Sequence, residues 1–190
     1  MIDRSDIAID PFSDLLRLAS VQTLISGEFY ASGAWAMQFP RPQGLKFFAI
    51  LKGHCWLQLA EQEPIRIDEG DVVLMHWTDT YRIASDLNAP LVDISTLMQQ
   101  YETSKIAILG DGSEFHQMGG HVSLDPERGT PIAELLPPLL HIRSDSPHAP
   151  VLKWLLDQLV RERSGQHLGS ALLVNQLAQM LFVHMLRIYL

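Results

Sequence analysis

The sequence has little cysteine, little basic charge and none of the common nucleotide-binding motifs. Cys55 is the single cysteine among 190 residues, so neither an intrachain disulfide nor a zinc site built from several cysteines can form. The 14 Lys and Arg against 22 Asp and Glu give a formal net charge of −8, so the chain alone is not expected to bind nucleic acid tightly. It contains no phosphate loop, dinucleotide fingerprint or hydrolase nucleophile elbow, so no motif supports a nucleotide-binding protein, a dinucleotide-dependent enzyme or a hydrolase.

The sequence also lacks a uniformly hydrophobic run. Four aspartates lie within Met1 to Ser20, which excludes a secretory signal peptide. Ala171 to Leu190 is the longest apolar stretch, but polar residues such as Asn175 and Arg187 interrupt it. We therefore expect a buried helix at this position, no membrane span and a cytoplasmic protein.

Hydrophobic residues make up 47% of the chain, enough for one well-cored domain with a helical appendage. Pro11 to Ala19 predicts a short amphipathic helix that begins with a proline in its first turn. From Val21 to Ala84, short alternating runs are separated by glycine and proline, which favours antiparallel strands. The expected fold class is α+β: a mainly β barrel or jelly roll followed by a helical hairpin.

Individual segments allow finer predictions. Leu45 to Leu51 is apolar on both faces, which predicts a strand covered on both sides. Phe115 to Leu124 is a further strand candidate, and its glycine pair, Gly119-Gly120, indicates a bulge or a close backbone approach. Gln99 to Phe115 shows no sustained period and is expected to be a mobile loop or a segment ordered by its neighbours, without an assigned function. Ile132 to Leu140 is expected to begin the helical part.

Two helices are predicted near the end of the sequence, from about Pro150 to Arg163 and from Ala171 to Leu190. The second is apolar on more than one face, and a second subunit is the simplest cover. We expect dimerisation through four of its residues; burial under the β region of the same chain is the alternative. These four residues are Leu173, Val174, Leu177 and Leu181.

The candidates for chemistry are sparse. The eight histidines form no pair at spacing i, i+2 or i, i+4 that would share a metal, so each is expected to be structural or solvated. His54 and Cys55 are neighbours on one strand and point to opposite faces, which argues against a thiol-imidazole dyad. What remains is an aromatic and sulfur-rich group of the type that lines ligand pockets in β-barrels, although residue type alone favours ordinary core filling. The group comprises Trp35, Phe47, Phe48, Cys55, Trp56, Met75, Trp77 and Tyr81.

Two segments of the β region, Gly44 to Leu57 and Pro64 to Met75, resemble the cupin-type N-terminal sensing domain of AraC-family transcription regulators. Shorter similar motifs follow along almost the whole chain: Pro11 to Leu16, Gly120-His121-Val122 with Asp125, Leu136-Pro137-Pro138 with His141-Ile142, and the closing helices. In that family the cupin part senses an effector, the helices after it dimerise, and a separate C-terminal domain with two helix-turn-helix units binds DNA.

The resemblance implies that residues 1–128 form an N-terminal helix and an effector-sensing barrel, and that residues 129–190 form a helical dimerisation segment. It implies a homodimer with an unknown small-molecule effector, and contact with DNA only through a domain beyond Leu190. The sequence ends inside an apolar helix with no glycine or asparagine stop, which indicates a boundary within a longer protein. The expected effector site is drawn from the group above together with a neighbouring histidine: Trp35, Phe47, Phe48, Cys55, Met75, His76 and Tyr81.

Metal-dependent cupin enzymes share this barrel, so a stand-alone isomerase or dioxygenase acting on a small acid or sugar is the alternative. Their first motif holds His-x-His and a Glu, but the sequence between Arg41 and Gly53 contains neither residue type. Tyr81 stands about where their second motif places a histidine. We therefore expect no catalytic residue, no metal and no cofactor. A ligand-free interaction domain without a cavity is a third interpretation.

Overall fold

The computed structural model describes residues 10–42, 44–60, 62–76, 80–165 and 167–190. Its first element is helix α1 (Pro11–Leu18), which confirms the helix predicted there. The Asp10 side chain caps this helix by accepting a hydrogen bond from the Ser13 N–H at 3.1 Å. Pro11 occupies the first turn, where its missing N–H costs no hydrogen bond.

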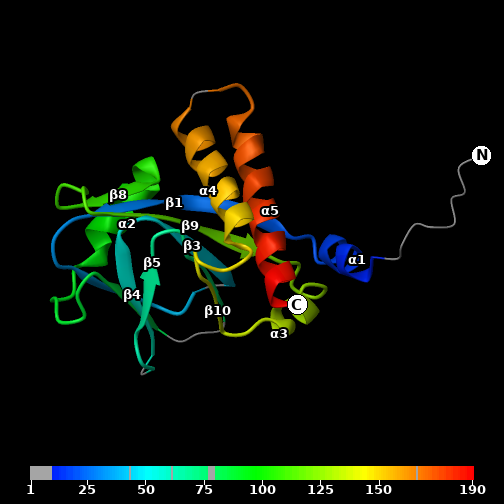
Figure 1. Ribbon diagram of the computed structural model, residues 1–190, viewed down its shortest axis with the longest axis horizontal. Helices are drawn as coiled ribbons and strands as arrows, with labels where there is room; N and C mark the ends of the chain where they lie inside the picture. The colour runs from blue at the N-terminus through cyan, green and yellow to red at the C-terminus, as the bar shows by residue number, and fades with distance from the viewer. Residues whose placement is uncertain (1–9, 43, 61, 77–79, 166) are drawn as a thin grey trace, which may run out of the picture.

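The strands of the described residues form two sheets that pack face to face (Figure 1). The larger sheet has the order β10-β6-β3-β9-β1-β8, and its pairs are antiparallel except for the parallel pair of β1 and β8. Its strands are β1 (Gln22–Ala31), β3 (Leu45–Lys52), β6 (Val72–Met75), β8 (Ile106–Leu109), β9 (Phe115–Ser123) and β10 (Leu139–Ile142).

The smaller sheet has four strands in the order β2-β7-β4-β5. These are β2 (Ala36–Phe39), β4 (His54–Leu59), β5 (Ile65–Asp68) and β7 (Tyr81–Ala84). Among the described residues, no hydrogen-bonded pair of named strands joins the two sheets, so they form an open jelly-roll-like sandwich and not a closed barrel. The expected α+β class with a jelly roll and C-terminal helices is confirmed.

Strand β3 lies in the interior of the larger sheet and separates two hydrophobic cores. Leu45, Phe47 and Ala49 belong to the core shared with the C-terminal helices. Phe48 and Ile50 belong to the core between the two sheets. Because successive side chains of a strand point to opposite faces, this arrangement confirms that the strand is covered on both sides.

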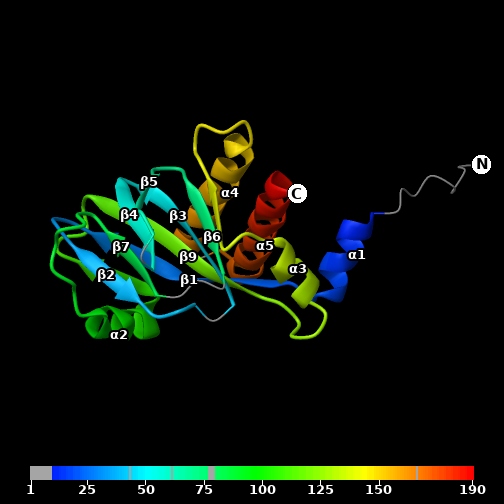
Figure 2. The same ribbon diagram turned by 90° about the horizontal axis from the view of Figure 1, so that it is seen from below.

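The helices cover opposite sides of this sandwich. Figure 2 shows α2 on one side of the sheets and the paired helices α4 and α5 on the other. The bounds are α2 (Ile94–Ser104), α3 (Thr130–Leu135), α4 (Ala149–Ser164) and α5 (Ser170–Tyr189). The helical hairpin predicted from the apolar stripes is therefore confirmed, and α4 and α5 both pack on the core that they share with the larger sheet.

Helix α5 is long and apolar enough to cross a membrane by length and composition alone. Core helices of soluble proteins meet the same criterion, and α5 packs one side into the core beside the larger sheet. The buried residues on that side are Ala178, Leu181, Phe182, Met185 and Leu186.

A buried carboxylate connects the larger sheet to the helical hairpin. The Arg163 Nε–H near the end of α4 donates to Glu28 Oε1 on β1 at 2.8 Å. The other carboxylate oxygen lies 2.8 Å from His116 Nε2 on β9 and accepts a hydrogen bond from the Tyr30 hydroxyl at 2.9 Å. Burial alone would raise the pKa of Glu28, but these hydrogen bonds outweigh it and lower the pKa from 4.5 to about 2.

Two segments differ from their predictions. The stretch from Gln99 to Phe115, expected to be a mobile loop or a segment ordered by its neighbours, is not a loop but holds most of α2 and the strand β8. The stretch from Ile132 to Leu140, expected to be helical, ends in β10, which pairs with β6 at the sheet edge. Tertiary pairing decided the second case, since Asp71 beside β6 accepts hydrogen bonds from the Ser144 N–H and lies 2.7 Å from His141 Nε2.

Candidate functional site

A cavity of about 390 Å³ is enclosed by both sheets and by helix α2. Its volume falls within the range of about 300–1,000 Å³ that is typical of small-molecule sites. Pro40, Arg41 and Met98 are solvent-exposed and mark its mouth, whereas Phe29 and Met37 are buried in its interior. The remaining lining residues are Ser26, Gly27, Phe39, Pro42, Lys46, Tyr81, Ile83, Ile94, Leu97, Tyr101, Gln117, Gly119, Gly120 and His121.

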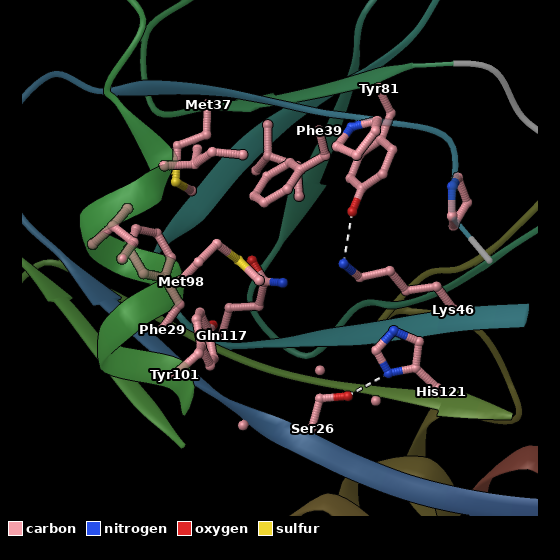
Figure 3. Close-up of a pocket in the computed structure, with 18 of the residues that line it drawn as sticks. Ser26, Phe29, Met37, Phe39, Lys46, Tyr81, Met98, Tyr101, Gln117 and His121 are labelled. Carbon is pink, nitrogen blue, oxygen red and sulfur yellow. Dashed lines mark hydrogen bonds between the residues drawn. The ribbon is translucent and has the colours of Figure 1, made fainter. Parts of the chain in front are cut away.

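One end of the cavity is apolar. Figure 3 shows Met37, Phe29, Met98 and Tyr101 gathered at this end, away from Lys46 and His121. Met37 comes from β2, Phe29 from β1, and Met98 and Tyr101 from α2. Thioether and aromatic side chains adapt to ligands of irregular shape, so this end suits a hydrocarbon or aromatic group.

The other end carries a cation. The Lys46 ammonium group on β3 donates a hydrogen bond to the Tyr81 hydroxyl at 2.7 Å (Figure 3). It also lies 5.2 Å from the centre of the Phe39 ring and 5.3 Å from that of Tyr81, two rings that stack on each other. Burial lowers the pKa of Lys46 to about 8, because an apolar environment disfavours the charged form. Burial likewise raises the pKa of the Tyr81 phenol, which stays a neutral hydrogen-bonding group.

Ser26 and His121 form a second polar pair at this end. The pairing of β1 with β9 shifts register between Ile25 and Gly27, so Ser26 sits at a bulge. The Ser26 hydroxyl hydrogen-bonds His121 Nδ1 across the two strands (Figure 3). Partial burial and then the nearby Lys46 charge lower the pKa of His121. Together, Lys46 and His121 make this end a focus of basic groups.

Glycine 27 allows α2 to close against the strands. A Cβ at this position would lie 2.7 Å from the Tyr101 ring, closer than any side chain tolerates. The Glu28 N–H on the same strand donates to the Lys105 carbonyl oxygen at 2.9 Å, which fixes the end of α2. The helix therefore becomes a wall of the cavity because the strand carries no side chain where Tyr101 lies.

The seven residues expected to bind the effector lie in different places. Tyr81 lines the cavity, and His76 is buried with its Nε2 3.0 Å from the Leu136 carbonyl oxygen. Trp35, Phe48, Cys55 and Met75 fill the core between the sheets, and Phe47 packs in the other core, against the helices. Of the wider aromatic group, Trp56 is half-buried on β4, and Trp77 lies outside the described residues.

Helix α2 was the main contributor that sequence reasoning missed, although the signal was present. Ile94, Leu97, Met98 and Tyr101 are spaced i, i+3, i+4 and i+7, which is the pattern of an amphipathic helix, and all four line the cavity. Asp93 precedes them as the N-cap, since its side chain accepts from the Ser95 N–H. Lys46 was also missed, because a lysine on an expected strand is ordinarily solvated.

The predicted faces of His54 and Cys55 agree with the structure. Cys55 is fully buried whereas its neighbour His54 is exposed, so they do not form a dyad, and burial raises the pKa of the Cys55 thiol. His121 lines the cavity, whereas His116 contacts Glu28 in the network toward α4. The glycine pair on β9 is a close approach, because a Cβ at Gly120 would collide with the Phe47 ring.

The fold is that of a cupin-type domain, and its cavity has the size of a small-molecule site. The family described as Cupin, Cupin_6, matches residues 10–190, and the chain belongs to this family.

The curated relatives are transcription regulators by name. Two proteins that carry the name of an AraC-like transcription regulator, from Streptomyces antibioticus and Streptomyces lividans, are 32% and 31% identical over 183 residues. The match covers 96% of this chain and 60% of each relative, so the chain spans about three fifths of their length. The resemblance to the cupin part of AraC-family regulators is thereby confirmed.

The chain also matches two solved structures, an apo ToxT K231A structure from Vibrio cholerae and YhaK from Escherichia coli. The ToxT match has 12% identity and a TM-score of 0.44 and covers 90% of this chain and 57% of ToxT. The YhaK match has 13% identity and a TM-score of 0.33 and covers 65% of this chain and 40% of YhaK.

Proposed function

We propose that this chain is the effector-sensing unit of an AraC-type transcription regulator, and that a small molecule binds in the cavity beside Lys46 and Tyr81. The observation that carries the proposal is the cavity of about 390 Å³, which combines an extended apolar wall with a few convergent polar groups. The cupin match over residues 10–190 and the names of the relatives support the regulatory role.

Strand β1 offers a short route from the cavity to the helical hairpin. Gly27 and Phe29 face the cavity, whereas Glu28 between them holds Arg163 of α4. An effector that binds one arrangement of β1 and α2 better than another shifts the population of that arrangement. The orientation of α4 and α5 follows through the Glu28 carboxylate.

We propose that the outer face of α5 forms a homodimer. Leu173 is 47% exposed, and Val174 and Leu177 are half-buried, so a second subunit could contact all three of these predicted residues. Leu181, the fourth, is fully buried within its own chain and packs in the core that α5 shares with the larger sheet. Contact with DNA belongs to a further domain of the regulator, and such a protein works in the cytoplasm.

The donor set supports a non-enzymatic role. Within the part of the chain that the structure describes, no group of three His, Cys, Asp or Glu side chains could hold a metal ion. Phe47, Phe48 and Tyr81 stand where the resemblance places ligands in metal-dependent cupin enzymes. Among the described residues, the stand-alone isomerase or dioxygenase therefore lacks the group of three donors that a catalytic metal needs.

Native mass spectrometry of the purified chain, before and after incubation with a metabolite extract, tests the sensing role. We expect one small molecule to bind with a stoichiometry of one per chain and to raise the melting temperature. Met98→Trp at the cavity mouth should abolish both effects, whereas Gln99→Trp, on the neighbouring exposed position of α2, should not. Binding that survives Met98→Trp, or no binding by the folded chain at all, would refute the proposal.

A further inference from the structure

The Lys46 ammonium group is a cation at one end of an otherwise apolar cavity. Its hydrogen bond to the Tyr81 hydroxyl uses one of its three protons, and the Phe39 and Tyr81 rings attract the charge only weakly. Desolvating an ammonium group is costly unless an anion pairs with it. Within the described residues, Lys46 forms no ion pair. The site therefore has an unmet requirement for negative charge.

Apart from the tyrosines, the other ionisable side chains that line the cavity are basic. His121 lies at the same end as Lys46 in Figure 3, and Arg41 lines the exposed mouth. No Asp or Glu is among the described residues that line the cavity. A cationic ligand would therefore meet repulsion and find no acceptor of its charge, whereas an anionic ligand would be attracted into the cavity.

We propose that the cavity binds a monocarboxylic acid with an apolar tail, whose carboxylate accepts hydrogen bonds from the Lys46 ammonium group while the tail lies along Phe29, Met37 and Met98. This inference rests on the proposed sensing function and names the chemical class of the effector. Tyr81 acts as a positioning residue, because its hydroxyl holds the lysine toward the cavity. Burial lowers the pKa of Lys46 to about 8, in agreement with the cost of desolvating the ammonium group.

Other ligand classes fit the lining less well. A sugar requires many hydrogen-bonding side chains, but apart from the basic residues and the tyrosines, Ser26 and Gln117 are the polar side chains among the described lining residues. A phosphate dianion keeps a strong hydration shell and needs several donors, which the apolar wall does not offer. A carboxylate carries one charge, needs few donors and leaves room for a hydrocarbon or aromatic tail.

The test compares octanoic acid with octanamide, which has the same tail and a neutral head of the same shape. Isothermal titration calorimetry at about pH 7 measures both ligands on the wild-type chain, on Lys46→Met and on Lys52→Met. Lys52 is the matched control, since it lies on the same strand, is exposed and donates to the Ser113 carbonyl oxygen. We expect the wild type and Lys52→Met to bind the acid at least about tenfold more tightly than the amide, the gain of one charge-assisted hydrogen bond.

Lys46→Met should lose the preference and bind the acid and the amide with similar affinity. Lys46→Arg keeps the charge and should retain part of the preference, which separates loss of charge from a folding defect. Equal affinity for acid and amide on the wild type, abolished by Met98→Trp, would overturn the carboxylate assignment and leave the sensing cavity standing. A preference that persists in Lys46→Met, or failure of the folded wild type to bind either ligand, would also overturn the assignment; the metabolite-extract experiment would then decide the sensing role separately.

Discussion

Replacing Arg163 by methionine is expected to lower the free energy of unfolding by about 3 kcal/mol, the low end of the cost of removing one partner from a buried ion pair. The Glu28 and Arg163 side chains are 10% and 19% exposed, so solvent offers little compensation for the lost 2.8 Å hydrogen bond. Glu28 keeps its contacts to His116 and Tyr30, which prevents a larger loss. The helical hairpin, which this pair ties to β1, should loosen first.

The pH dependence gives an independent estimate of the same network. The pKa of Glu28 is lowered from 4.5 to about 2 in the folded chain. At 1.36 kcal/mol per pKa unit, this lowering corresponds to about 3 kcal/mol of stability. Because the folded pKa is the lower one, the contribution is complete above pH 4.5 and is lost as the pH falls toward about 2.

Urea unfolding followed by circular dichroism measures these free energies. Arg161→Met is the matched control, because Arg161 also lies in the last turn of α4 but is exposed, and its loss should change stability by less than about 0.5 kcal/mol. The stability gap between wild type and Arg163→Met should be constant from about pH 7 to pH 5 and shrink below pH 4.5. Equal losses for the two arginine variants, or a gap that does not change in acid, would refute the role given to the Glu28 carboxylate.

Three further predictions follow from the sequence and the fold together. Elemental analysis should find no stoichiometric transition metal, since Phe47, Phe48 and Tyr81 occupy ligand positions; about one metal per chain, retained through mild chelation, would contradict this. A gel shift at about 0.15 M salt should show only weak, sequence-independent DNA binding by this chain of net charge −8, and tight selective binding would overturn that expectation. Leu173→Glu should convert a dimer into soluble monomer in sedimentation experiments, whereas Leu181→Glu should unfold the chain because Leu181 is 0% exposed; a wild-type monomer at tens of micromolar would count against the dimer.

Much of the scaffold could be predicted because its signals are local. The proline and aspartate before α1, the two-sided apolar pattern of β3, and the stripes of α4 and α5 each lie within a short window of sequence. The glycine pair Gly119-Gly120 also indicated a close approach to the backbone, although the sequence did not identify the approaching group, which is the Phe47 ring. Hydrophobic periodicity and turn residues are therefore sufficient to predict a helix or strand whose burial follows a regular pattern.

The cavity was harder to predict because its lining comes from segments far apart in the chain. Residue type suggested Trp35 and Met75, but large apolar side chains fill cores as readily as pockets. Lys46 lines the cavity only because β7 brings the Tyr81 hydroxyl within 2.7 Å of it. The hydrophobic pattern of α2 is weak, which made the helix easy to miss. Its packing on the strands also depends on Gly27, whose importance becomes clear only once Tyr101 is seen to lie against it. Such relations between distant residues leave no local pattern.

The one-strand thickness of the wall formed by β3 has an evolutionary consequence. Lys46 points into the cavity, while the next residue, Phe47, packs toward the helices. Under the proposed sensing function, substitutions at position 46 can therefore change which molecules are recognised without altering the surface on which α4 and α5 rest. Substitutions at position 47 affect the helices and leave the ligand contacts in place. Selection can therefore act separately on residues 46 and 47. Related proteins can differ in the ligand that they recognise while the packing of α4 and α5 on the sheet stays the same.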